Sequence, residues 1–139
     1  MMTMLSGRGE DYLEAIYNIN NKKGYVRVKD VAAALSVKYS SVTEMLKKLH
    51  EMRMVSYEKY GGVMLSEKGL EIARVVKDRH DTLVKLLRAA GVPDNTADAD
   101  ACVMEHHLSP GSLERLKKLV SVLESDHGSR LLKEHLQES

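Results

Sequence analysis

Apolar residues recur along this chain at the three- and four-residue spacing of amphipathic helices, with polar residues between them. Leu13 and Ile16 begin one such stripe, and Val42, Leu46 and Leu49 form another. Residues typical of turns separate the stripes. The pattern predicts a mainly α protein with helices over residues 9–20, 29–35, 40–52, 66–90, 95–108 and from 110 onward, and a short amphipathic tail over residues 126–136.

A different pattern follows the third helix. Two runs of β-prone residues flank Tyr60, Gly61 and Gly62, and a Gly-Gly pair in that position indicates a β-hairpin. A tight turn joins the second and third helices, and Ser40 or Ser41 is expected to cap the third. This is the order of a winged helix-turn-helix domain. We therefore expect such a domain over residues 1–70 and a second, helical domain over residues 71–139.

Composition adds the cellular setting. The 139 residues include no Phe or Trp, so the core must be built mainly from aliphatic residues and Met. The net charge of +1 excludes a globally basic coat, although residues 27–59 carry more Lys and Arg than acids. The single cysteine, Cys102, cannot form an internal disulfide. No apolar run approaches the ~20 residues that span a bilayer, and no signal peptide is recognisable. We expect a cytoplasmic protein without a membrane partner.

The helix-turn-helix order predicts DNA binding. The major groove of DNA admits one α-helix, whose first turn reaches base edges with short polar side chains and offers backbone N–H groups to phosphate. Lysines beside that turn and at the hairpin add positive charge. The alternative is an ordinary helical hairpin whose lysines are merely solvated. The residues expected to contact DNA are Arg27, Lys38, Tyr39, Ser40, Ser41, Thr43, Lys47, Lys48 and Lys59.

A second cluster predicts a metal site. Three side chains with different donor atoms stand at positions i, i+3 and i+4 of the fifth helix, and two carboxylates stand three residues apart on the first. One sulfur, imidazoles and carboxylates together suit five- or six-coordinate Fe²⁺ or Mn²⁺, in one site or in two that share a carboxylate. Asp98, one turn before the cysteine, is either an outer carboxylate or an extra ligand. The candidate ligands are Asp11, Glu14, His80, Cys102, Glu105 and His106.

Each candidate ligand also has a purely structural explanation, and two other function classes remain. A winged-helix regulator could respond to a small organic effector, although six Tyr and no other aromatic make a large apolar pocket less favoured. A di-iron enzyme would need Glu-x-x-His pairs, but Leu108 follows Glu105 at that spacing and Tyr17 follows Glu14. His-Glu-x-x-His and phosphate-loop motifs are absent from the sequence. We expect no enzymatic activity.

Several segments together resemble the diphtheria toxin repressor / manganese transport regulator family of metal-dependent repressors. They are EDYLEAIY (10–17), GYVRV (24–28), SSVT (40–43), YEKYGG (57–62), RH (79–80) and ACVMEHHLS (101–109). The resemblance implies a homodimer that binds a palindromic operator and controls metal homeostasis genes. It also implies a helical metal-binding and dimerisation domain after the winged domain, and all six candidate ligands match family ligand positions.

The chain departs from both branches of that family. The manganese branch usually has Glu where this chain has Cys102, and the iron branch usually has Met in place of Asp11 and no acid at Glu14. The resemblance therefore implies Fe²⁺ or Mn²⁺, one or two per subunit, without choosing between them; other divalent transition metals are expected to bind in vitro. The length matches the short form, without the SH3-like domain of longer members.

Overall fold

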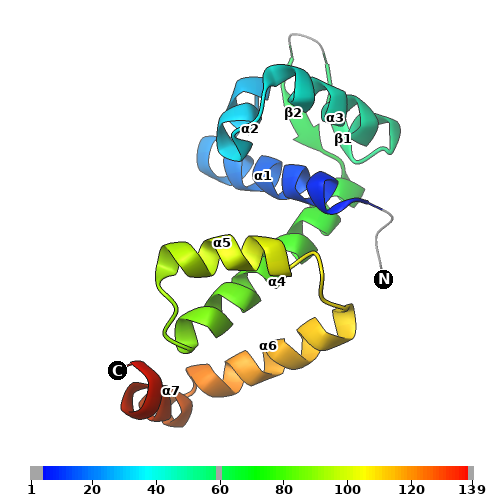
Figure 1. The fold of residues 1–139 in the computed structure, drawn as a ribbon. Helices are drawn as coiled ribbons and strands as arrows, with labels where there is room; N and C mark the ends of the chain where they lie inside the picture. Colours follow the sequence, from blue (N-terminus) through cyan, green and yellow to red (C-terminus); the bar gives the residue numbers. More distant parts are fainter. Residues whose placement is uncertain (1–4, 59–60, 138–139) are drawn as a thin grey trace. The chain divides into compact units, whose positions relative to one another are not determined.

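The computed structural model describes residues 5–58 and 61–137. The chain is mainly helical with one small sheet, as predicted, and it divides into two compact units between Val76 and Lys77, inside helix α4 (Glu67–Ala89). The N-terminal unit is that of residues 5–76 and the C-terminal unit that of residues 77–137 (Figure 1). The domain boundary expected after residue 70 stays a prediction. None of the described helices is long and apolar enough to cross a membrane.

The N-terminal unit encloses its own apolar core under a short hairpin. Its elements, besides the start of α4, are α1 (Gly7–Lys23), α2 (Val28–Leu35), α3 (Tyr39–Glu51), β1 (Val55–Tyr57) and β2 (Val63–Leu65). The predicted helical stripes supply the core, because each apolar side chain leaves water when the helices pack. The residues of this core that are less than 2% exposed are Tyr12, Leu13, Ile16, Val26, Val31, Val42, Leu46, Leu49 and Ala73.

The predicted hairpin is present. Strands β1 and β2 pair antiparallel, with Tyr57 opposite Val63. The backbone N–H of Val63 also donates to the carbonyl of Val26 at 2.9 Å, which fixes the hairpin to the segment between α1 and α2. Lys59, expected to contact DNA at the hairpin tip, lies outside the described residues.

Two helix ends in this unit differ from the prediction. Helix α1 continues through the segment expected to form a turn and ends only at Gly24, whose φ of 81° is favourable for glycine. Helix α3 begins at Tyr39 after Lys38, and its N-cap makes no side-chain hydrogen bond. The prediction of a serine cap was therefore wrong. Ser40 lies inside the first turn, where its carbonyl accepts a hydrogen bond from the Thr43 hydroxyl.

The C-terminal unit is built from the rest of α4 and four further elements: α5 (Asp94–Met104), α6 (Pro110–Glu124), α7 (Asp126–Leu132) and the π-helix η1 (Lys133–Gln137). Gly91, with φ of 93°, follows α4, and Ser109 caps α6 with Pro110 in its first turn, as expected. Helix α5 ends four residues earlier than predicted, and the expected tail helix becomes α7 and η1.

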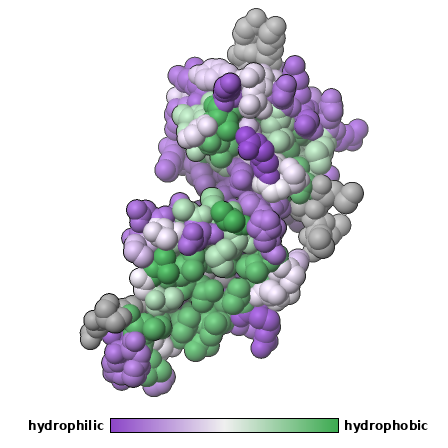
Figure 2. Space-filling model, in the orientation of Figure 1, coloured by the Kyte–Doolittle hydropathy of each residue, from purple (hydrophilic) through white to green (hydrophobic). Residues whose placement is uncertain are grey.

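The buried core of the C-terminal unit is small. It contains Leu83, Ala101 and Leu113, with partly buried apolar residues packed around them. Other apolar side chains stay exposed in the single chain, among them Leu119 and Val122 of α6 and Leu131 of α7. Figure 2 shows hydrophobic residues gathered on the visible face of this unit. Such a surface is typical of a domain that associates with another copy.

Candidate metal centre and nucleic-acid interface

Three candidate ligands meet within the C-terminal unit. His80 comes from α4, Cys102 from the last turn of α5, and Glu105 from the residue that follows that helix. One ligand atom of each lies within 4.8 Å of the other two. An imidazole nitrogen, a sulfur and a carboxylate oxygen at such spacing form a donor set suited to a transition-metal ion.

Glu105 is the most enclosed member of this group, with an exposed fraction of 0%. Its Oε2 lies 3.0 Å from Nδ1 of His80. Its Oε1 lies 3.2 Å from Nε2 of His106 but accepts no hydrogen bond of ordinary geometry from the described residues. A buried carboxylate that faces two imidazoles and retains accepting capacity fits a bound cation, which would offset the cost of burying its charge.

Apolar packing between α4 and α5 accounts for this arrangement. Leu83 of α4 and Ala101 of α5 belong to the same buried cluster. His80 precedes Leu83 by three residues, and Glu105 follows Ala101 by four, so each polar residue is on the same helical face as its apolar neighbour. The Glu105 N–H still donates to the Ala101 carbonyl at 2.9 Å, which continues the helical geometry beyond Met104. The core contact therefore places the imidazole against the carboxylate.

The outer edge of His80 contacts a further carboxylate. Its Nε2 lies 2.8 Å from Oδ1 of Asp98, which is in the middle of α5. The Asp98 side chain is 69% exposed, whereas that of His80 is 13% exposed. His80 is thus held between two acidic residues from opposite edges of its ring.

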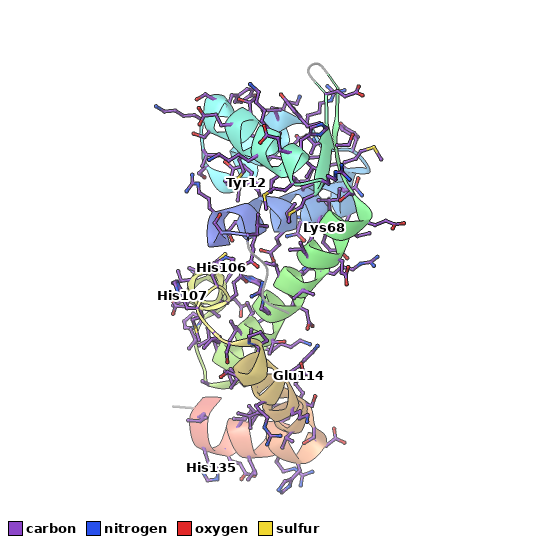
Figure 3. All side chains as sticks on the ribbon, turned by 90° about the vertical axis from the view of Figure 1, so that its right-hand side faces the viewer. Tyr12, Lys68, His106, His107, Glu114 and His135 are labelled. Atoms are coloured by element: carbon purple, nitrogen blue, oxygen red, sulfur yellow. The ribbon has the colours of Figure 1, made fainter. Side chains whose placement is uncertain are left out.

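The two histidines after α5 differ in exposure. The side chain of His106 is 13% exposed and lies beside Glu105, whereas His107 is exposed. Figure 3 labels both at that end of α5. Arg79 contributes a second link here, because its Nη1 donates to the Glu105 carbonyl at 3.3 Å. The structure therefore gathers four of the six predicted ligands in the C-terminal unit.

The other two predicted ligands belong to the N-terminal unit. Asp11 and Glu14 are three residues apart on α1, which places them on one face of that helix. Glu14 is buried and Asp11 half-buried. Their coordination of the same ion stays a prediction.

The predicted DNA-binding residues are accessible in the N-terminal unit. Those described are all exposed or half-buried, and they lie on α3 and at the starts of α2 and α3. Arg27 and Tyr39 meet in a groove of about 440 Å³ that the hairpin also lines. Lys29 and Tyr57 line the same groove, although sequence reasoning did not select them. Lys29 follows Arg27 by two residues, and the charge of that segment was the signal available.

Tyr25 was also missed. Its ring is 52% exposed and lies 5.4 Å from the guanidinium of Arg27 and 5.0 Å from the Lys23 ammonium. Lys23 in turn pairs with Asp30 at 2.8 Å, and this hydrogen bond raises the pKa of Lys23 and lowers the pKa of Asp30. Asp30 also accepts a hydrogen bond from the Arg27 N–H. These contacts fix the entry to α2 beside the groove.

Two family descriptions match the chain. The first, "Iron dependent repressor, N-terminal DNA binding domain", matches residues 4–63. The second, "Iron dependent repressor, metal binding and dimerisation domain", matches residues 66–133. Together they account for nearly the whole sequence.

Curated relatives agree with these matches. The HTH-type transcriptional regulator MntR of Bacillus subtilis (strain 168) is 44% identical over 117 residues, which are 84% of this chain and 82% of the relative. MntR of Bacillus velezensis is 42% identical over 121 residues, or 87% of this chain and 85% of the relative.

Solved structures share the fold. The manganese regulator SloR matches with a TM-score of 0.71 and 31% identity, over 81% of this chain and 53% of that one. A manganese-dependent transcriptional repressor in complex with manganese matches with a TM-score of 0.76 and 26% identity, over 81% of this chain. The present chain spans about half the length of these two solved chains.

Proposed function

We infer, because this chain belongs to the iron dependent repressor family, that it is a metal-activated transcriptional repressor which binds operator DNA as a homodimer. The activating ion is Fe²⁺ or Mn²⁺, and the regulated genes are those of metal homeostasis. The observation that carries the metal dependence is the buried Glu105 between two imidazoles and beside a thiol. The family is one of repressors rather than enzymes, and we place the protein in the cytoplasm.

The ion is proposed to bind His80, Cys102, Glu105 and His106. When bound it supplies positive charge, which neutralises the buried carboxylate and orders the imidazoles around it. The chain's own contribution is a rigid donor set, because Glu105 is enclosed and its backbone is held by both Ala101 and Arg79. One thiolate among nitrogen and oxygen donors leaves Fe²⁺ and Mn²⁺ both acceptable.

Asp11 and Glu14 are proposed to complete the coordination from α1. Helix α1 belongs to the unit that carries the DNA-reading elements, so ligands contributed by it would link ion occupancy to that unit. Without the ion, the carboxylates of this set repel one another. A coupling of about 1–3 kcal/mol, or roughly 5–150-fold in DNA affinity, is typical of such linkage.

DNA recognition is assigned to the first turn of α3 and the adjoining groove. The lack of a side-chain cap at Lys38 leaves the N–H groups of that turn available for phosphate. A dimer presents two α3 helices, and reading two half-sites of a palindrome requires them about 34 Å apart or a multiple of that distance. The exposed apolar residues of α6 and α7 are proposed to contribute to the dimer contact.

The test is anaerobic DNA binding with and without metal. A duplex bound in the presence of Mn²⁺ is first selected from a random pool, and its affinity is then measured by fluorescence anisotropy with Mn²⁺, with Fe²⁺ and with chelator. We expect the chelator to weaken binding by at least 5-fold, at the lower end of the usual coupling range of roughly 5–150-fold. Equal affinity in all three conditions would contradict metal activation.

Two variants separate metal binding from metal response. The double substitution D11A/E14A should leave the four C-terminal ligands in place, so some Mn²⁺ binding persists, but the gain in DNA affinity on adding the ion should disappear. Cys102→Glu should shift preference from Fe²⁺ towards Mn²⁺, because an oxygen donor replaces sulfur. If D11A/E14A keeps the full gain, α1 does not supply ligands.

A further inference from the structure

We propose that Asp98 is a positioning residue for the metal centre, whose carboxylate keeps the proton of His80 on Nε2 and so presents the Nδ1 lone pair to the ion. The proposal rests on the metal-dependent function proposed above. It assigns to α5 a second task besides supplying Cys102, and it identifies Asp98 as an outer carboxylate rather than a ligand.

The two nitrogens of His80 face different carboxylates. Nδ1 lies 3.0 Å from Glu105 Oε2, on the side where the ligand group meets, and Nε2 lies 2.8 Å from Asp98 Oδ1. A neutral imidazole carries one proton, and a nitrogen that coordinates an ion must be the other one. With Asp98 accepting at Nε2, the proton stays on that nitrogen and Nδ1 is the coordinating atom.

Asp98 lies on the wrong edge of the ring to share the ion with Glu105. The nitrogens of an imidazole point away from each other, and the Asp98 oxygen contacts the one that faces away from Glu105. Among the described residues, Asp98 belongs to no group of potential ligand atoms within 4.8 Å of one another. Its side chain is 69% exposed, whereas Glu105 is fully enclosed. Burial thus separates the inner carboxylate from the outer one.

The exposure of Asp98 sets the size of the expected effect. Removal of an outer hydrogen-bond partner typically lowers metal affinity by about 10–100-fold. Water can replace part of the Asp98 interaction, so we expect the lower end, about 10-fold. Asp100 offers a matched control, because it is an exposed aspartate two residues along the same helix. Its removal changes the local charge equally without touching His80.

The experiment measures Mn²⁺ affinity of the full chain by competition with a fluorescent chelator, for the parent, Asp98→Ala, Asp98→Asn and Asp100→Ala. We expect about 10-fold weaker binding for Asp98→Ala and parent-like binding for Asp100→Ala. Asp98→Asn should lie between them, because its amide oxygen can still accept from Nε2. Equal affinities of the two alanine variants would overturn the proposal. Matching melting temperatures in chelator establish that both variants are folded.

A second readout addresses the tautomer directly. Nitrogen NMR of the Zn²⁺-loaded parent should place the His80 proton on Nε2 and the ion on Nδ1, and Asp98→Ala should show a mixture. A proton on Nδ1 in the parent would overturn the proposal while leaving metal activation intact. A parent protein that binds neither Mn²⁺ nor Fe²⁺ would overturn both proposals.

Discussion

Replacing Glu105 with glutamine removes one negative charge, and almost no volume, from the most enclosed position of the proposed metal centre. Water cannot take the place of the missing oxygen charge, because Glu105 is 0% exposed. An ion present at about 100 times its dissociation constant stabilises a protein by about 2.7 kcal/mol. For a chain of this size, at about 4 °C per kcal/mol, that corresponds to a rise of about 10 °C in melting temperature.

The substitution should remove most of that rise. If affinity falls about 100-fold, the same free Mn²⁺ only equals the new dissociation constant, and the stabilisation shrinks to about 0.4 kcal/mol, or less than about 2 °C. The assay is calorimetric melting of parent and variant in buffered Mn²⁺ and in chelator, comparing the difference between the two conditions. That difference cancels any effect of the substitution on the metal-free protein.

Glu114→Gln is the matched control. It makes the same chemical change on the exposed surface of α6, where Figure 3 labels Glu114, and should retain the full rise of about 10 °C. If Glu105→Gln also retains the rise, the ion does not bind at Glu105. The reasoning that connects a buried carboxylate with a cation would then fail for this protein.

Three further outcomes are expected. Asp30→Asn should destabilise the protein in urea unfolding at pH 7; because the lysine partner lowers the pKa of Asp30, the pair's contribution is full above the ordinary value of 3.8 and is lost as pH falls through the lowered pKa, so the variant and the parent should converge in acid. Gly69→Ala should lower the free energy of unfolding by about 1–3 kcal/mol, because an added Cβ would overlap the carbonyl oxygen of Met54, and a parent-like urea midpoint would refute this. The double variant K47A/K48A should weaken DNA binding uniformly across sequences and reduce the salt dependence by about one unit of slope for each phosphate that is no longer neutralised; an unchanged slope in anisotropy titrations would argue against a role of these lysines at the DNA backbone.

The sequence predicted the elements well because burial determines where they form. Stripes such as Leu13 with Ile16, or Val42 with Leu46, are fully buried in the structure, and the helices containing them were located correctly. Helix ends were predicted less well. Helix α1 ends where Gly24 adopts a left-handed conformation, and nothing in the apolar pattern distinguishes Gly24 from the turn residues before it.

The candidate site divides in the same way. Cys102, Glu105 and His106 are close in sequence, so helical spacing alone was enough to group them. The contact between His80 and Asp98 spans 18 residues and two helices, and only packing determines which edge of the imidazole the aspartate reaches. Sequence reasoning therefore left Asp98 open between two roles. The stacking of Tyr25 on Arg27 was not predicted because an exposed tyrosine carries no pattern of its own.

The same packing that fills the small core of the C-terminal unit also sets the distances between ligands. Leu83 and Ala101 share a buried cluster, and the polar pair of His80 and Glu105 lies one turn along the same two helices. Ala101 has a small side chain, which permits close approach of a neighbouring helix, and its carbonyl holds the backbone of Glu105. Ligand geometry is therefore a consequence of core packing, and a larger residue at position 101 would disturb both together.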